Sequence, residues 1–262
     1  MKAAQFARKK IFQKLWLRLN KISLIGMNYW ASNLENSGEI DAISFVKRKY
    51  TNKDRPIIFD VGANIGDFSI KCADIFQDNC NIFAFEPSKN TYKSYCDRLY
   101  KKIKSGIVFP INCGVGNQAG SVLLYSSEEN STIASVYQLD RPIRPFVDEL
   151  TETITLVTID EFCSEHGIDH IAFLKLDIEG HELAALSGAS RMITEERIDA
   201  IQFEFGENNV SSRTFMSDFD KLLGEKFNIY RIIPGGLIKW TYQGGASEIF
   251  ATMNYLAVKK AS

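Results

Sequence analysis

The sequence predicts an α/β fold, in which a mostly parallel sheet of seven strands is covered by helices on both faces. Three observations lead to this prediction. From Ile57 onward, short apolar segments of strand length alternate with segments of helical periodicity. Most of these apolar segments are continuous, which is typical of parallel strands that are buried on both faces. No linker rich in Pro, Gly or Ser divides this part of the chain, so we expect a single doubly wound domain.

The first half of the domain alternates regularly between strands and helices. Residues 57–61 form a short apolar strand, and the segments at residues 81–86 and 108–112 repeat its character. Helical periodicity over residues 65–76 and 90–103 separates these strands. The succession of strand, helix and strand is typical of parallel βαβ units.

The pattern changes between residues 120 and 157, where extended segments are separated by a polar stretch and a Pro-containing stretch. This change predicts an inserted, hairpin-like pair of strands that lies over one end of the sheet. Such insertions often form part of a substrate-binding surface. Thr158 and Glu161 then have the spacing of a capping box, which predicts a short helix to about residue 165.

The alternation of strands and helices resumes after this insertion. Strands are expected at residues 171–176, 200–205, 228–233 and 254–258, and helices at residues 181–187 and 218–226. The turn at residues 234–236, with the sequence Pro-Gly-Gly, leads to the last strand, so the sheet should close with a C-terminal hairpin.

Residues 1–50 should form an N-terminal helical segment that precedes the α/β domain of residues 51–262. The first 21 residues contain seven Lys and Arg side chains, and apolar residues recur between them at helical spacing. Charges interrupt the apolar positions, which argues against a secretory signal, and no stretch reaches membrane-spanning length. We expect this basic amphipathic helix to pack on the domain; peripheral contact with a membrane is the alternative.

Composition excludes some classes of protein. Lys and Arg total 31 against 32 Asp and Glu, so the net charge is −1 and no overall field attracts a polyanion; nucleic acid is not an expected partner. The five cysteines are odd in number and form no C-x-x-C pair. This usage is typical of buried thiols in a reducing compartment, so we expect a cytoplasmic protein.

Residues 58–69, with the sequence IFDVGANIGDFS, place a glycine-containing turn at the end of the first predicted strand. Asp60 lies near the end of the strand, and Gly62, Asn64 and Gly66 lie in the turn. Ligands of open α/β folds bind at the carboxyl ends of the strands. A nicotinamide dinucleotide is disfavoured, because the glycine spacing does not match G-x-G-x-x-G.

The ends of the next two predicted strands add polar groups at the same edge of the sheet. Glu86, in FAFEPS, ends the second strand, where a carboxylate can accept hydrogen bonds from both hydroxyl groups of a ribose. Asn112 and Cys113, in INCGVG, end the third strand and could lie against an adenine. These groups indicate an adenosine-containing ligand without a diphosphate, such as S-adenosylmethionine.

Four motifs of this chain resemble those of the FkbM family of S-adenosylmethionine-dependent methyltransferases. They are DVGANIGDFS, FAFEPS, INCGVG and FLKLDIEGHELAALSGA, which occur in that order within about residues 35–260. The stretch from Lys175 to Glu182 is the most specific of them. The resemblance implies a class I Rossmann-like methyltransferase fold and an enzyme that O-methylates sugars or related hydroxyl compounds.

The resemblance also assigns the cofactor-binding residues. It implies that the methionine and ribose side of the cofactor is lined by Asp60, Gly62, Asn64, Gly66 and Phe68, that Glu86 holds the ribose with Pro87 and Ser88 beside it, and that Asn112 and Cys113 approach the adenine.

The segment KLDIEGHE places carboxylates and a histidine at the end of the strand at residues 171–176. Methyl transfer from a sulfonium to a hydroxyl group is an in-line displacement, and a group that accepts the hydroxyl proton accelerates it. We expect Asp177 to position the acceptor and take its proton, with Glu179 and His181 behind it. Glu182 could instead stabilise the first turn of the next helix.

A divalent cation is an alternative means of activating the acceptor. Asp177 and Glu204, at the ends of two neighbouring strands, could ligate Mg²⁺ or Ca²⁺, which would lower the pKa of a bound hydroxyl group. The expected reaction uses no metal, and the sequence leaves the alternative open.

The sequence therefore predicts an S-adenosylmethionine-dependent O-methyltransferase. Its acceptor should be a small molecule or a saccharide, such as a sugar or a glycosylated or lipid-linked intermediate of polysaccharide biosynthesis. Three alternatives remain open: an NAD-dependent oxidoreductase, an RNA methyltransferase, and a module that binds the cofactor without catalysis.

Overall fold

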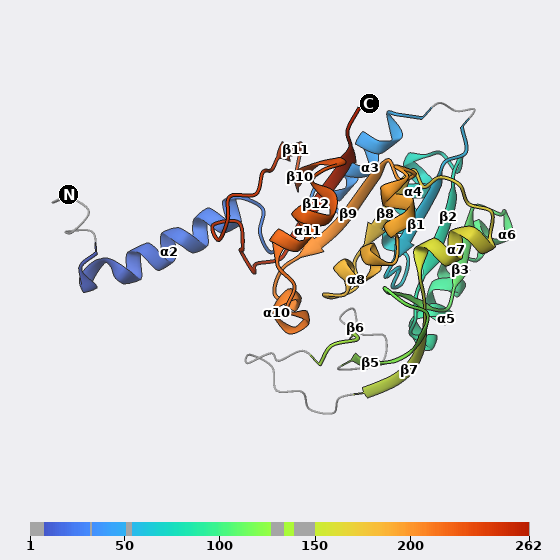
Figure 1. Cartoon of the computed structure of the whole chain (residues 1–262), viewed down its shortest axis with the longest axis horizontal. Helices are drawn as coiled ribbons and strands as arrows, with labels where there is room; N and C mark the ends of the chain where they lie inside the picture. The colour runs from blue at the N-terminus through green and yellow to red at the C-terminus, as the bar shows by residue number, and fades with distance from the viewer. Residues whose placement is uncertain (1–7, 32, 51–53, 127–133, 139–149, 262) are drawn as a thin grey trace.

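The central sheet of the protein contains eight strands. The structure is a computed structural model that describes residues 8–31, 33–50, 54–126, 134–138 and 150–261. The strand order is β11-β10-β12-β9-β8-β1-β2-β3 (Figure 1). The bounds are β1 Ile57–Val61, β2 Asn81–Phe85, β3 Val108–Ile111, β8 Phe173–Leu176, β9 Ala200–Phe205, β10 Phe227–Ile233, β11 Gly236–Lys239 and β12 Met253–Lys259.

The predicted α/β class is confirmed, but the sheet is mixed and has one strand more than the seven predicted. Strands β3, β2, β1, β8 and β9 are parallel, whereas β12, β10 and β11 join by antiparallel pairing. The additional strand, β11, forms because Gly235 and Gly236 reverse the chain with φ values of +88° and +149°. The sequence predicted this turn but not the strand, which has four residues and no buried side chain.

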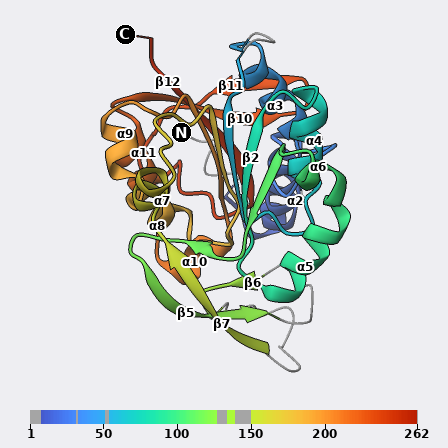
Figure 2. The ribbon, with the colours of Figure 1, turned by 90° about the vertical axis from the view of Figure 1, so that its right-hand side faces the viewer.

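Helices cover both faces of the sheet, as predicted (Figure 2). One face carries α3 (Glu39–Lys47), α4 (Asp67–Ile75), α5 (Lys89–Arg98) and α6 (Tyr100–Lys104), and the other carries α7 (Ile159–Glu165), α8 (Glu182–Ser187), α9 (Ser190–Thr194) and α11 (Met216–Leu223). Each face has its own apolar core, because successive side chains of a strand point to opposite faces. The short helices α9 and α10 (Asn208–Ser212) were not predicted.

The predicted insertion is confirmed as a second, smaller sheet beside the carboxyl ends of the central strands (Figure 2). Its order is β4-β7-β5-β6, with bounds β4 Gly114–Val115, β5 Gly120–Ser126, β6 Ala134–Ser135 and β7 Leu150–Val157. Strands β5 and β7 form the antiparallel pair. The polar and Pro-containing stretches of the insertion lie mostly outside the described residues.

The N-terminal helix α2 (Lys10–Gly26) stands out from the rest of the molecule (Figure 1). None of its residues is buried, and Leu24, in its last turn, packs against the core. The expectation that this helix packs along the domain is therefore wrong, because its axis leads away from the body and only its end reaches the core. Among the helices of the described residues, none combines the length and the apolar character needed to cross a membrane.

Candidate active site

Two adjoining cavities lie at the carboxyl ends of β1, β8 and β9. The larger cavity has a volume of about 540 Å³ and the smaller one about 90 Å³. Both are lined by Gly62, Asn64, Asp177 and Glu179, so these four residues mark the place where the cavities meet. Two turns, one after β1 and one after β8, supply all four residues.

The turn after β1 depends on glycine at position 62. Gly62 has a φ of +77°, and a Cβ atom there would lie 1.9 Å from the backbone oxygen of Asp177. The N–H groups of Gly62 and Ala63 both donate to the carbonyl of Phe85, which fixes the turn to β2. Gly66 lines neither cavity; a Cβ atom there would meet Leu99 and Tyr95, so it serves the packing of α4.

Glu86 lies on the wall of the smaller cavity, beside Pro87. It is 8% exposed, and its two carboxylate oxygens accept the backbone N–H groups of Asn64 at 2.9 Å and Ser88 at 3.0 Å. Burial raises the pKa of Glu86 to about 7, although these two hydrogen bonds lower it. Since each oxygen has one protein donor, each can still accept a hydrogen bond from a ligand.

Asn112 and Cys113 lie behind this wall, and neither lines a cavity. The amide group of Asn112 donates to the carbonyls of Glu86 at 2.9 Å and of Pro87 at 3.0 Å. Cys113 is 7% exposed and belongs to the apolar core. In this structure Asn112 supports the segment that carries Glu86, and neither residue lines a cavity that an adenine could enter.

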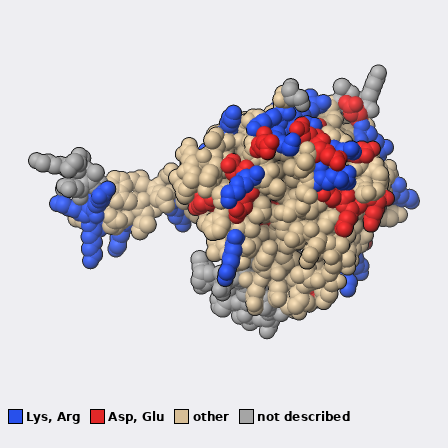
Figure 3. Space-filling view, viewed as in Figure 1, with Lys and Arg blue, Asp and Glu red and all other residues tan. Residues whose placement is uncertain are grey.

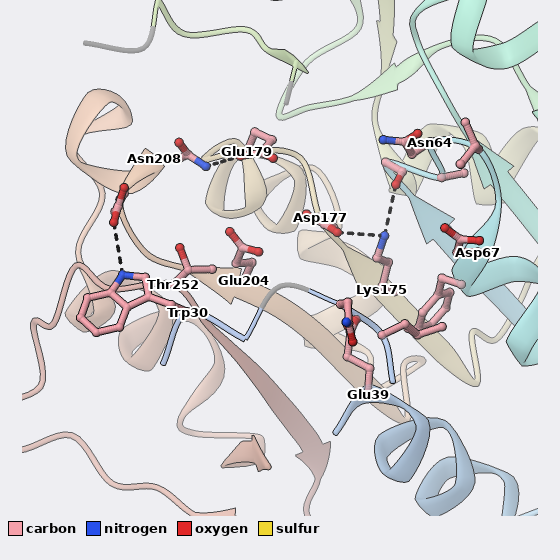
Figure 4. A pocket seen from close by; sticks show the side chains of 17 residues that line it. Trp30, Glu39, Asn64, Asp67, Lys175, Asp177, Glu179, Glu204, Asn208 and Thr252 are labelled. Carbon is pink, nitrogen blue, oxygen red and sulfur yellow. Dashed lines mark hydrogen bonds and ion pairs between the residues drawn. The ribbon is translucent and has the colours of Figure 1, made fainter. Parts of the chain in front are cut away.

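A buried ion cluster lies beneath the larger cavity. Lys175, on β8, is 4% exposed, and its Nζ lies 3.3 Å from Asp60 Oδ1 and 3.1 Å from the carbonyl of Gly62. It also lies 3.4 Å from Asp177 Oδ2 (Figure 4). Burial lowers the pKa of Lys175, but the carboxylates of Asp177, Asp60 and Glu39 outweigh it and hold the pKa above its usual value. The site therefore contains a permanently charged lysine.

Asp60 is fully buried and has no surface in either cavity. Besides the ion pair with Lys175, it accepts a hydrogen bond of 2.7 Å from Ser69. It was expected to line the cofactor, whereas this geometry gives it the role of anchoring Lys175. Phe68 does line the larger cavity, and the Nζ of Lys175 lies 5.4 Å from the centre of its ring.

Carboxylates form one wall of the larger cavity (Figure 4). They come from three elements: Glu39 from α3, Asp177 and Glu179 from the turn after β8, and Glu204 from β9. Burial raises the pKa of Glu204 well above its usual value, and the neighbouring carboxylates of Asp177 and Glu179 raise it further. The wall therefore favours an uncharged or cationic group against it.

Glu179 and Glu39 are held in place by polar neighbours. Glu179 has a φ of +54° and accepts a short hydrogen bond from Asn208 (Figure 4). Glu39 accepts hydrogen bonds from Gln202 at 2.6 Å and from Ser37 at 2.8 Å. Both carboxylates thus have fixed orientations before any ligand binds.

His181 lines the smaller cavity and not the larger one. Its Nδ1 is 3.0 Å from the hydroxyl oxygen of Tyr137, and burial lowers its pKa to about 4, so the ring is neutral. Its Nε2 is buried and has no hydrogen-bond partner among the described residues.

The buried carboxylate of Glu182 stabilises the turn after β8. It is 1% exposed, and its Oε1 accepts the N–H groups of Ile178 at 2.9 Å and Gly180 at 3.2 Å. Burial raises the pKa of Glu182 to about 7. Its contacts are those of a structural residue that shapes the turn carrying Asp177 and Glu179.

Several residues that line the cavities were not predicted from the sequence to do so. Trp30 and Glu39 come from the N-terminal segment, Asn208 from a helix that was not predicted, and Leu124 and Ile154 from the insertion. The last two close the smaller cavity with apolar surface. In β7 the alternation of polar and apolar residues in the sequence could have indicated that Ile154 faces inward.

The possible metal site at Asp177 and Glu204 receives no support from the geometry. Both residues line the larger cavity. In the part of the chain that the structure describes, however, no group of three or more His, Cys, Asp or Glu side chains is arranged to hold a metal ion.

Comparison with known proteins gives consistent results. A family model described as the methyltransferase FkbM domain matches residues 60–229. The chain is 27% identical over 190 residues to the hexuronic acid methyltransferase AglP of Haloferax volcanii, and this alignment covers 72% of the chain and 69% of that protein. It also resembles the crystal structure of a methyltransferase FkbM from Methylobacillus flagellatus, with a TM-score of 0.52 and 17% identity.

The likeness to the solved structure supports the fold. It covers 79% of this chain but only 44% of the other one, so the chain spans less than half the length of that solved relative. The order of the strands β3-β2-β1-β8-β9 and the position of the cavities at their carboxyl ends agree with an α/β methyltransferase architecture.

Proposed function

The chain belongs to the FkbM methyltransferase family, and on this basis we propose that it transfers the methyl group of S-adenosylmethionine to a hydroxyl group of a sugar. The observation that carries the proposal is the junction of the two cavities at Gly62, Asn64, Asp177 and Glu179. One cavity suits an adenosine and the other suits a methionine tail with an acceptor, so the reacting atoms would meet beside Asp177.

Three features of the lining of the smaller cavity suit an adenosine. Glu86 offers two carboxylate oxygens with remaining capacity to accept hydrogen bonds from ribose hydroxyl groups. Leu124 and Ile154 provide apolar surface for a base. Asn64 Oδ1 and His181 Nε2, both on its wall, are buried without a hydrogen-bond partner among the described residues, and a ligand could satisfy them.

The residues at the junction can orient an acceptor and receive its proton. S-adenosylmethionine supplies an electrophilic methyl group when it is bound. Asp177 has a partly exposed carboxylate that lies 3.4 Å from Lys175 Nζ, and this ion pair orients it towards the junction. We assign Asp177 the role of accepting the hydroxyl proton on a carboxylate oxygen. Glu179 and Asn208 then fix the acceptor by hydrogen bonds.

The larger cavity suits a sugar as the acceptor. It combines the indole of Trp30 with polar side chains of Asn33, Asn208 and Thr252, so it offers both a flat apolar surface and many hydrogen-bond partners. The relative AglP is named for a hexuronic acid substrate, which supports a saccharide for this chain too. We propose a monosaccharide unit, free or within a glycosylated intermediate.

The cofactor is tested by titrating the protein with S-adenosylhomocysteine, the product of the donor. We expect micromolar binding that weakens more than about tenfold in Glu86→Ala, because two hydrogen bonds to the ribose are lost. NADH serves as the comparison ligand and should not bind. A folded protein that binds NADH and not S-adenosylhomocysteine would support the oxidoreductase alternative.

The catalytic role is tested with radiolabelled S-adenosylmethionine and a panel of saccharides. Asp177→Asn should reduce kcat about a hundredfold while S-adenosylhomocysteine affinity changes little, since loss of a general base typically has this size. Asp67→Asn is the matched control: it makes the same charge change on the same cavity, in a residue paired with Arg98 at 2.6 Å. Equal losses in both variants would remove Asp177 from this role.

Two further properties belong to the same proposal. We propose a reaction without a metal ion, so EDTA should leave the rate unchanged; inhibition by EDTA that Mg²⁺ reverses would contradict it. We also propose a cytoplasmic enzyme, supported by five cysteines that are all unpaired in the structure. Transfer to RNA instead of any saccharide would favour the RNA methyltransferase alternative.

A further inference from the structure

Helix α2 exposes a row of large apolar side chains to solvent. Ile11, Leu15, Leu19 and Ile22 follow one another at spacings of three or four residues, so they lie on one side of the helix. Their exposed fractions are 79%, 47%, 44% and 64%. Exposure of this kind along a whole helix is costly in water, and it marks an interaction surface.

A row of basic side chains runs beside the apolar row. Lys10, Lys14, Arg18 and Lys21 recur at the same spacings, one residue out of phase, and all four are exposed. The helix contains no acidic residue. In Figure 3 the outer part of α2 shows blue basic side chains and tan surface, without red acidic ones.

The two rows together indicate what covers the helix. Nucleic acid would neutralise the basic row but would leave the apolar row in water. A second copy of α2 would cover the apolar row but would bring two basic rows close together, with no acidic residue in either helix to pair them. The surface of an anionic bilayer satisfies both rows, because it offers hydrocarbon and phosphate at adjacent depths.

Ile25, three residues after Ile22, extends the apolar row towards the body of the protein and is 56% exposed.

The end of α2 is fixed to the rim of the larger cavity. Two residues after Gly26, the side-chain amide of Asn28 donates to the carbonyls of Ser37 at 2.8 Å and Ile232 at 3.1 Å. The backbone N–H of Trp30 donates to the carbonyl of Thr252 at 2.8 Å, and both of these residues line the larger cavity. A surface that binds α2 therefore also keeps the wall of the larger cavity close to that surface.

We propose that α2 binds the surface of an anionic phospholipid membrane, with its apolar row in the acyl-chain boundary and its basic row against lipid phosphates. Binding in this way holds the larger cavity near the membrane. If the proposed function is correct, the acceptor is then a saccharide carried on a lipid. This second step rests on the proposed function, whereas the membrane contact does not.

The test is co-sedimentation of the full chain with vesicles of phosphatidylcholine alone or mixed with phosphatidylglycerol. We expect binding to the mixed vesicles only. Leu15→Gln/Leu19→Gln should abolish it, and Lys14→Gln/Arg18→Gln should weaken it about fivefold for each charge removed. Lys93→Gln/Lys101→Gln is the control: it removes two exposed charges from α5 and α6 and should bind like the unaltered protein.

Three outcomes would overturn the proposal. They are absence of binding to mixed vesicles, binding that survives Leu15→Gln/Leu19→Gln, and a dimer in the absence of lipid that this variant disperses. Titration with S-adenosylhomocysteine, without vesicles, separates the two proposals. Normal cofactor binding with no sedimentation refutes only the membrane contact, and sedimentation without cofactor binding refutes only the proposed function.

Discussion

Single residues beneath the candidate site pair a buried positive charge with buried carboxylates. Asp60, Lys175 and Gln202 face one another in the register of β1, β8 and β9. A lysine buried alone in this position would be strongly destabilising. Here the carboxylates of Asp60 and Asp177 pair with the positive charge of Lys175. Asp60 also accepts a hydrogen bond from the hydroxyl group of Ser69. The ion cluster thus fixes Asp177 relative to the sheet.

The first prediction concerns this cluster. Lys175→Met should reduce the free energy of unfolding by about 3–5 kcal/mol, because it leaves the carboxylate of Asp60 buried without its cation. The double variant Asp60→Asn/Lys175→Met should recover part of this loss. Urea denaturation measures both. Lys102→Gln is the control, since its ion pairs with Asp74 and Asp78 are at the surface and should be worth about 1 kcal/mol or less.

For single residues, the sequence predicted a place at the cavities correctly where a residue follows a strand within a recognisable motif. Asp177 and Glu86 line the cavities as expected, because the carboxyl ends of parallel strands meet at one edge. It could not separate Asp60, whose carboxylate lies between the sheet and α4, from Asn64, which lines both cavities. That distinction depends on the twist and on the exact turn. Trp30 was beyond reach because it lies far away in the sequence, outside any recognised motif.

Among the elements, the two turns after β1 and β8 determine each other's shape. The second prediction is that Gly62→Ala weakens S-adenosylhomocysteine binding more than about tenfold and lowers stability by several kcal/mol, since the new methyl group would overlap the carbonyl of Asp177. Gly106→Ala is a matched control. Its φ of +69° carries a similar strain of about 1–2 kcal/mol, but nothing lies within 4 Å of the new atom. If the two substitutions changed affinity equally in calorimetry and stability equally in urea denaturation, backbone strain alone would be responsible.

The inserted sheet provides the third prediction, through two adjacent residues of β5. Leu124 is 5% exposed and lines the smaller cavity, whereas Leu123 is 45% exposed on the opposite face. Leu124→Ala should weaken S-adenosylhomocysteine binding about tenfold, because it removes apolar contact with the base. Leu123→Ala should bind normally. Similar affinities for the two variants, measured by titration calorimetry, would place the adenosine elsewhere.

Elements were predictable where periodicity was long and continuous. All seven predicted strands of the central sheet and the hairpin of the insertion are present. The strand β11 and the helix α10 were missed, because four or five residues carry too little periodic signal. For α2 the sequence predicted the helix correctly, but an amphipathic pattern does not specify whether the apolar face meets protein, another copy or a membrane.

At the scale of the whole molecule, several carboxylates keep their protons in the folded state to a higher pH than in the unfolded state. Burial raises the pKa of Glu182 to about 7, from 4.5 in an unfolded chain, with a smaller increase from Asp177. Its contribution to stability is therefore fully present below pH 4.5 and is lost as the pH rises to about 7, because the unfolded chain releases the proton first. His181 acts in the opposite direction, since burial lowers its pKa from 6.5 to about 4.

The fourth prediction isolates one of these groups with Glu182→Gln. The amide oxygen can accept the same N–H groups of Ile178 and Gly180, but the side chain cannot ionise. The variant should therefore gain stability relative to the parent protein between pH 5 and pH 8, by up to about 3 kcal/mol. The opposing effect of His181 is common to both proteins and cancels. Urea denaturation across this range measures the difference, with Glu165→Gln, exposed on α7, as the control.

Parallel stability curves for the Glu182→Gln variant and the parent protein would show that Glu182 ionises equally in the folded and unfolded states. In that case the turn carrying Asp177 would not depend on a protonated carboxyl group.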